Sequence, residues 1–195
     1  MTGASRPLPC LVCRMTMILW LTDQQAQTII RHLQEERHQE GCGLLIGSED
    51  GQVIEVIPAK NVAQHPQRHY EIAHHTLVET ITSAQKHGLE LLGFYHSHPN
   101  GDPIPSSTDV AQANYPDAAY LIVGFAGDAP KLAAWRIRRH EVERLQLHVG
   151  DSMPVTQDTG LSGNHKFAII VSAIFAFVFM IVLSLSLLPP APEIP

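Results

Sequence analysis

The sequence predicts one mixed α/β domain followed by a hydrophobic C-terminal segment. Short apolar runs that suit strands alternate with stretches whose apolar residues recur at helical spacing. The chain has 195 residues, enough for one domain with a sizeable core and some appended sequence. Residues 167–188 carry no charge and no proline, which sets this segment apart from the domain.

The first fourteen residues show no periodicity, and we expect residues 1–16 to be disordered or an extension. The chain has only three cysteines, so a reducing compartment is natural and a disulfide framework is not expected. Cys10 and Cys13 have the spacing of half a zinc ribbon, but no second pair completes the four ligands. A secretory signal fits poorly, because the apolar run is short and Arg14 interrupts what precedes it.

The domain is predicted to cover residues 17–149 and to begin with a strand at residues 17–21. Thr22 and Gln25 have the form of a capping box, so a helix should begin there and end near His38. Its apolar residues form one stripe. Residues 43–46 and 53–57, separated by turn residues, predict a hairpin.

The second half of the domain should contain two more helices and four strands. A helix over residues 77–84 has Gly88 as its expected cap. A buried strand follows at residues 91–95, and a helix near Asp109 is expected to end at Pro116. Three further strands are predicted at residues 120–125, 132–138 and 142–149.

A metal site is predicted where the strand at residues 91–95 ends. His96 and His98 are spaced i, i+2, so their side chains point to one face of the strand. Asp109 lies eleven residues after His98, just inside a helix whose start carries capping hydroxyls. A loop with three prolines connects them and is stiff enough to hold the carboxylate opposite the histidines.

Two imidazoles and one carboxylate suit Zn²⁺, and three protein ligands leave one tetrahedral position open for water. An open position implies catalysis. The alternative is purely structural. In that interpretation His96 and His98 lie at the edge of the core, Ser106 is an N-cap, and Asp109 complements the helix dipole.

The pattern His96-x-His98-Pro99-x6-Ser106-x2-Asp109 resembles the signature of the JAMM (MPN+, JAB1/Mov34) metalloprotease family, with no departure at those positions. The family also carries a glutamate just before a Cys-Gly-Leu-Leu strand, and here Glu40 precedes that sequence. The resemblance covers about residues 17–149 and is greatest to the compact prokaryotic members.

The resemblance implies a cytidine-deaminase-like MPN fold, with a curved, largely antiparallel sheet flanked by helices. It implies one Zn²⁺ per chain, held by His96, His98 and Asp109, whose fourth ligand is a water. Glu40 would act as general base and then general acid. Ser106 would donate a hydrogen bond to the oxyanion. The expected reaction is hydrolysis of an amide or isopeptide bond near the C-terminus of a ubiquitin-like or sulfur-carrier-like protein.

Two other functional classes share this chemistry or this fold. A metal-free MPN scaffold that only assembles partners is one, although the complete ligand set argues against it. A zinc deaminase is the other, but its H-x-E and P-C-x-x-C signature is absent from the sequence.

A formal charge of −6 argues against a nucleic-acid partner. The other ten histidines are expected to be surface or packing residues, although His65 and His69 could lie near the cleft.

The C-terminal segment is expected to anchor the protein in a membrane. Residues 150–166 form a polar linker, and residues 167–188 are long enough to cross a hydrocarbon core of about 30 Å. Residues 189–195 form a short tail, as in a tail-anchored protein. Lys166 gives a weak positive-inside bias, which predicts a cytoplasmic catalytic domain.

Overall fold

The computed structural model describes residues 18–152 together with Ser172, Phe177 and Met180. The chain divides into two compact units, residues 1–154 and 155–195. The predicted extension and tail lie outside the described residues. Of the predicted linker only residues 150–152 are described, and of the predicted membrane span only Ser172, Phe177 and Met180. Among the residues that are described, no helix is both long and apolar enough to cross a bilayer.

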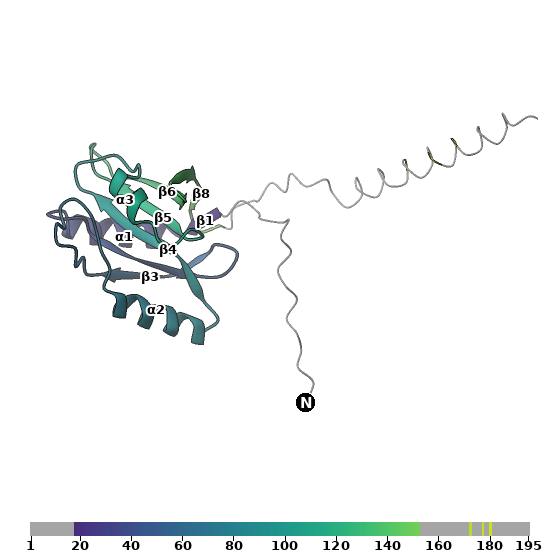
Figure 1. The fold of residues 1–195 in the computed structure, drawn as a ribbon, viewed down its shortest axis with the longest axis horizontal. Helices are drawn as coiled ribbons and strands as arrows, with labels where there is room; N and C mark the ends of the chain where they lie inside the picture. The colour runs from purple at the N-terminus through teal and green to yellow at the C-terminus, as the bar shows by residue number, and fades with distance from the viewer. Residues whose placement is uncertain (1–17, 153–171, 173–176, 178–179, 181–195) are drawn as a thin grey trace, which may run out of the picture. The chain divides into compact units, whose positions relative to one another are not determined.

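The described part of the domain contains eight strands and three helices (Figure 1). In chain order they are β1 Ile18–Leu21, α1 Asp23–Glu35, β2 Cys42–Gly47, β3 Val53–Ala59, α2 His74–Lys86, β4 Glu90–His98, α3 Ser107–Gln112, β5 Ala119–Gly124, β6 Lys131–Arg138, β7 Glu141–Arg144 and β8 Gln146–Val149. The predicted mixed α/β class is therefore confirmed, and so is the hairpin, which is β2 and β3.

Six strands form the main sheet in the order β3-β2-β4-β5-β6-β7. Only β4 and β5 are parallel, and every other neighbouring pair is antiparallel. The expectation of a largely antiparallel sheet is confirmed. β1 and β8 pair in parallel as a separate two-stranded sheet, which was not predicted.

The single strand predicted at residues 142–149 is wrong, because the structure divides it into β7 and β8. Leu145 separates them. Its side chain is buried, and its N–H donates to the carbonyl of Ala134. Burying this apolar side chain turns the chain at the end of β7, and β8 then pairs with β1.

Two apolar cores lie on opposite faces of the main sheet, because successive side chains of a strand alternate between faces. α1 contributes Leu33 to the core that contains Tyr95. α2 contributes Leu77 to the core that contains Phe94, and α3 packs against this second core. His96, two residues after Phe94, therefore faces the side of the sheet that α2 and α3 cover.

Capping residues fix where α1 and α3 begin. Thr22 and Gln25 form the predicted capping box of α1. The predicted ends were too late: α1 ends at Glu35 rather than near His38. α3 ends at Gln112 rather than at Pro116, because the next residue already has an extended backbone. Pro116 thus lies beyond the helix that it was expected to terminate.

Candidate metal centre

The two histidines converge at the end of β4, which extends to His98 rather than ending at Tyr95 as predicted. Both side chains lie on the same face of the strand. Their Nε2 atoms are 3.3 Å apart. His96 is fully buried, and the side chain of His98 is 12% exposed. The strand therefore presents both imidazoles to one point that opens to solvent beside His98.

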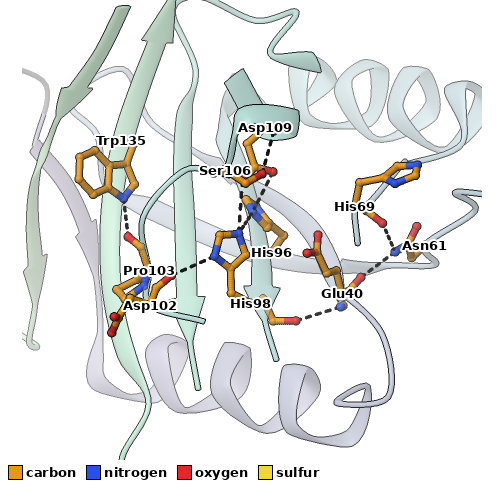
Figure 2. Close-up of polar contacts among 12 residues, drawn as sticks. Glu40, Asn61, His69, His96, His98, Asp102, Pro103, Ser106, Asp109 and Trp135 are labelled. Carbon is orange, nitrogen blue, oxygen red and sulfur yellow. Dashed lines mark hydrogen bonds and ion pairs between the residues drawn. The ribbon is translucent and has the colours of Figure 1, made fainter. Parts of the chain in front are cut away.

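The start of α3 brings Asp109 to that point. The Asp109 N–H donates to Ser106 Oγ at 3.1 Å, and the Ser106 N–H donates to Asp109 Oδ2 at 2.7 Å. These bonds orient the carboxylate so that Oδ1 is 3.4 Å from His96 Nε2 and Oδ2 is 3.3 Å from His98 Nε2 (Figure 2). Asp109 thus belongs both to the capping box of α3 and to the cluster of His96, His98 and Asp109.

The proline-rich loop between β4 and α3 holds His98 in one tautomer. Trp135 Nε1 donates to the carbonyl of Pro103 at 2.8 Å, which anchors the loop. His98 Nδ1 lies 2.9 Å from the carbonyl oxygen of Asp102. A carbonyl only accepts, so Nδ1 carries the proton and Nε2 keeps a lone pair for a metal. Gly124 allows the loop to approach, because a Cβ there would lie 2.6 Å from a loop carbonyl oxygen.

The electrostatics of His96 and Asp109 suit a metal site, whereas those of His98 favour its protonated form in the metal-free protein. Burial acts to lower the pKa of His98, but hydrogen bonds to Asp109 and to the Asp102 carbonyl outweigh burial and raise that pKa. Burial lowers the pKa of His96, which favours the neutral imidazole that binds metals. Burial alone would raise the pKa of Asp109, but the two imidazoles and the Ser106 N–H outweigh it and hold that pKa well below its usual range. Asp109 is therefore an ionised ligand at neutral pH.

The ligand atoms of His96, His98 and Asp109 lie close enough together to hold one metal ion. One ligand atom from each residue lies within 4.8 Å of the other two. The two Nε2 atoms are 3.3 Å apart, as expected for two ligands about 2.0–2.1 Å from one Zn²⁺. The Asp109 carboxylate faces both imidazoles, with Oδ1 3.4 Å from His96 Nε2 and Oδ2 3.3 Å from His98 Nε2. The structure therefore assembles the group of residues that the sequence predicted as ligands.

Glu40 lies beside the cluster and is not part of it. The next residue, Gly41, donates its N–H to Ser97 Oγ at 3.0 Å, and the Ser97 N–H donates to the Gly41 carbonyl at 3.0 Å. This pairing places Glu40 next to the segment of β4 that bears the histidines. Figure 2 shows its carboxylate directed towards them. Glu40 Oε2 is buried without a hydrogen-bond partner among the described residues.

The buried carboxylate of Glu40 has an unusual acidity. Burial raises its pKa to about 7, while the charge of His98 acts to lower that pKa and the charge of Asp109 to raise it. A buried group without a partner reduces stability when it is ionised. Such a group is expected where function rather than stability fixes the residue.

We expect Glu40→Gln to stabilise the metal-free protein at pH 8. The folded-state pKa of about 7 is above the ordinary value of 4.5, so ionisation of Glu40 destabilises the folded state as pH rises from 4.5 to 7. The difference between these two pKa values corresponds to roughly 3 kcal/mol in the free energy of unfolding above pH 7. Urea unfolding with a chelator at pH 8 and pH 5 measures it. A variant that is not more stable at pH 8, or whose advantage does not shrink at pH 5, would contradict the assignment.

Two residues near the centre were not predicted. The ring of Tyr70 stacks on His96 with centroids 4.4 Å apart and an interplanar angle of 24°. Asn61 is buried and donates to the carbonyl of Glu40. Both belong to the polar connection between β3 and α2, where no periodic pattern marks a site. His65 and His69, in the same connection, do not join the metal-binding group.

A cavity of about 470 Å³ adjoins Asp109 on the face covered by α2 and α3. Aromatic side chains form much of its wall, among them Phe94, Tyr115 and Tyr120. Polar groups, including His74, lie on the same wall. A cavity of this size and mixed lining is typical of a ligand-binding site.

Residues 22–138 match the family described as prokaryotic homologs of the JAB domain. Desampylase of Haloferax volcanii is 35% identical over 109 residues, which are 53% of this chain and 78% of that protein. A probable TtuB-protein conjugate cleaving protease of Thermus thermophilus is 36% identical over 96 residues, 49% of this chain and 63% of that protein. The solution structure of a Desulfitobacterium hafniense protein superposes with a TM-score of 0.63 at 29% identity, covering 70% of this chain and 95% of that one.

Proposed function

Because the chain belongs to the family of prokaryotic homologues of the JAB domain, as its JAMM-like signature predicted, we propose that this JAMM-type hydrolase is a zinc-dependent isopeptidase. Its substrates would be conjugates of a ubiquitin-like or sulfur-carrier-like protein. One observation carries the proposal: His96, His98 and Asp109 form a group fit for a metal beside Glu40, whose buried Oε2 has no hydrogen-bond partner among the described residues. The names of two relatives, a desampylase and a probable conjugate-cleaving protease, support this substrate class.

Glu40 is the residue that moves protons in this mechanism. His96, His98 and Asp109 would hold the zinc ion, which would supply Lewis-acid chemistry for the scissile carbonyl and for water. The Glu40 carboxylate accepts a proton from the attacking water and then delivers it to the leaving amine. In the protein without its metal, burial raises the pKa of Glu40 to about 7, and a general acid or base works best with a pKa near the working pH.

Ser106 supplies a hydrogen bond to the developing oxyanion. Its Oγ accepts the Asp109 N–H at 3.1 Å, which leaves the O–H proton for the substrate because a hydroxyl both donates and accepts. The helix cap therefore fixes the oxygen without using its proton.

Ser106→Ala should lower kcat by about 10²–10³-fold, the usual effect of removing one oxyanion donor. It should also destabilise the fold by about 1 kcal/mol through loss of the cap. Thr22→Ala is the matched control, because it removes the equivalent cap from α1. Steady-state kinetics and thermal unfolding of both variants separate the effects. Equal kcat values in the two variants would show that Ser106 serves only as a cap.

The cavity beside Asp109 offers space for the part of a conjugate that flanks the scissile bond. Its aromatic wall suits apolar groups of a substrate chain, and its polar groups suit the peptide backbone. A carrier tail that ends in Gly-Gly is narrow enough to reach the largely buried cluster, in which the side chains of His98 and Asp109 are 12% and 5% exposed.

We also propose that residues 167–188 anchor the protein in a membrane, with the catalytic domain in the cytoplasm. The segment carries no charge and no proline, and its described residues Phe177 and Met180 are helical with exposed fractions of 67% and 68%. Lys166 precedes the segment and supports the orientation.

The full chain should remain in the membrane pellet after a carbonate wash, whereas a chain ending at Gly150 should appear in the supernatant. The reason is that an uncharged run of this length partitions into the bilayer. Fractionation followed by immunoblotting measures this. Recovery of the full chain in the supernatant would contradict the anchor, and digestion of the domain by protease added outside intact cells would contradict the orientation.

An isopeptide-linked conjugate of a carrier protein ending in Gly-Gly tests the proposed function. The full chain should release the free carrier and the free target. A chelator should stop the reaction and zinc should restore it. Binding of conjugates without cleavage, across carriers of both the ubiquitin-like and the sulfur-carrier type, would favour the scaffold alternative instead.

A further inference from the structure

Asn61 is a buried polar residue outside the metal cluster. It begins the loop of residues 61–72, which connects β3 with α2. The backbone of Asn61 pairs with that of Ile72 in an isolated antiparallel bridge. The Val62 N–H donates to the Glu71 carbonyl at 2.9 Å. The two ends of the loop are therefore joined.

The side-chain amide of Asn61 fills the interior of this loop and satisfies its backbone. The nitrogen donates to three carbonyl groups, and the oxygen accepts from two N–H groups. The carbonyls belong to Glu40 at 2.8 Å, His69 at 3.1 Å and Pro66 at 3.4 Å, and the N–H groups to Ala63 at 3.0 Å and Glu71 at 3.1 Å. Only an amide combines these donors and acceptors at this length.

Both backbone polar groups of Glu40 are bonded to the loop. The Glu40 N–H donates to the Pro66 carbonyl at 2.7 Å. The Glu40 carbonyl accepts from Asn61 (Figure 2). The buried Oε2 of Glu40 has no hydrogen-bond partner in the described part of the chain, whereas the backbone from which this side chain extends is held by both bonds to the loop.

We propose that Asn61 is a positioning residue, which fixes the backbone of Glu40 and so aims its carboxylate at the metal cluster. The same loop carries Tyr70, whose ring stacks on His96. The inference rests on the proposed hydrolase function, in which Glu40 is the general base.

A double-mutant cycle separates positioning from a merely structural role. In the wild-type background, Asn61→Ala should lower kcat by up to about 10²-fold, as expected for a misplaced catalytic group. In the Glu40→Gln background the same change should alter kcat by less than about twofold, because the base that Asn61 positions is already lost. An equal loss in both backgrounds would overturn the inference.

Asn61→Asp is a second variant that keeps the size and the accepting oxygen. It cannot donate to the Glu40 carbonyl, so the same dependence on background is expected even if Asn61→Ala does not fold.

Gln25→Ala is the matched control. The Gln25 amide donates to the Val53 carbonyl at 2.9 Å and accepts the Thr22 N–H at 2.9 Å. Its loss should leave kcat unchanged in both backgrounds.

Amide hydrogen exchange of the full chain tests the same inference without a substrate. Asn61→Asp removes the bonds that the amide nitrogen donates to the carbonyls of Glu40, Pro66 and His69. It should speed exchange of the Glu40 N–H by at least about tenfold, since losing one hydrogen bond already has an effect of this size. The Leu45 N–H in β2 should be unaffected. If the wild-type protein cleaves no conjugate, the proposed function fails. The exchange measurement still decides whether Asn61 fixes the backbone of Glu40. Unchanged exchange at Glu40 would overturn it.

Discussion

Glu40→Gln should slow hydrolysis by about 10²–10⁴-fold and leave zinc content unchanged. Glutamine keeps the shape of the side chain but cannot accept a proton from water, and loss of a general base has an effect of this size. Glu40 is not one of the residues that could hold the metal. The measurement is kcat for cleavage of a purified conjugate, with elemental analysis of the same sample.

Glu55→Gln is the matched control for this prediction. It makes the same chemical change on the exposed part of β3 and should leave kcat unchanged. A Glu40→Gln protein as fast as wild type would contradict the assignment of the base. Loss of zinc in that variant would instead make Glu40 a ligand.

Asp109→Asn should remove zinc from the protein and reduce cleavage to background. The amide oxygen can still accept the Ser106 N–H in the capping box of α3. The substitution nevertheless replaces an ionised ligand by a neutral one. Changing a residue that only hydrogen-bonds to a metal ligand already weakens metal binding by about 10–100-fold. Changing a ligand itself should therefore have a larger effect. Elemental analysis should find one zinc per wild-type chain and none in the variant.

Asp102→Asn is the control for the loss of a nearby carboxylate. Asp102 contacts the site through its backbone carbonyl, which accepts from His98, while its side chain pairs with Lys131 at the surface. Zinc should therefore remain. His96→Ala should behave as Asp109→Asn does. Stoichiometric zinc in both ligand variants would contradict the assigned set.

Local rules predicted the geometry of the metal cluster. Strand alternation places His96 and His98 together, and the spacing of Ser106 and Asp109 defines a capping box. These rules act over a few residues and need no knowledge of the fold. The role of Glu40 needed the family resemblance, because its approach to β4 depends on the pairing of Gly41 with Ser97, far away in the sequence.

The features that sequence reasoning missed arise from contacts between distant segments. β1 pairs with β8 across the whole domain, and no local pattern specifies this pairing. Tyr70 and Asn61 lie in an irregular connection, where polar composition predicts only a loop. The positioning role proposed for Asn61 rests on five hydrogen bonds, which only the folded loop makes visible.

Cleavage in ¹⁸O-labelled water tests whether this protein hydrolyses an isopeptide bond with Glu40 as the base. The substrate is a carrier protein whose terminal Gly-Gly is joined to a lysine of a target, and intact-mass spectrometry follows both products. We expect the zinc-loaded chain to release an unmodified target and a carrier with one ¹⁸O atom in its terminal carboxylate. The Glu40→Gln variant should release almost no target or carrier. Intact conjugate, or cleavage at a different bond, would contradict it.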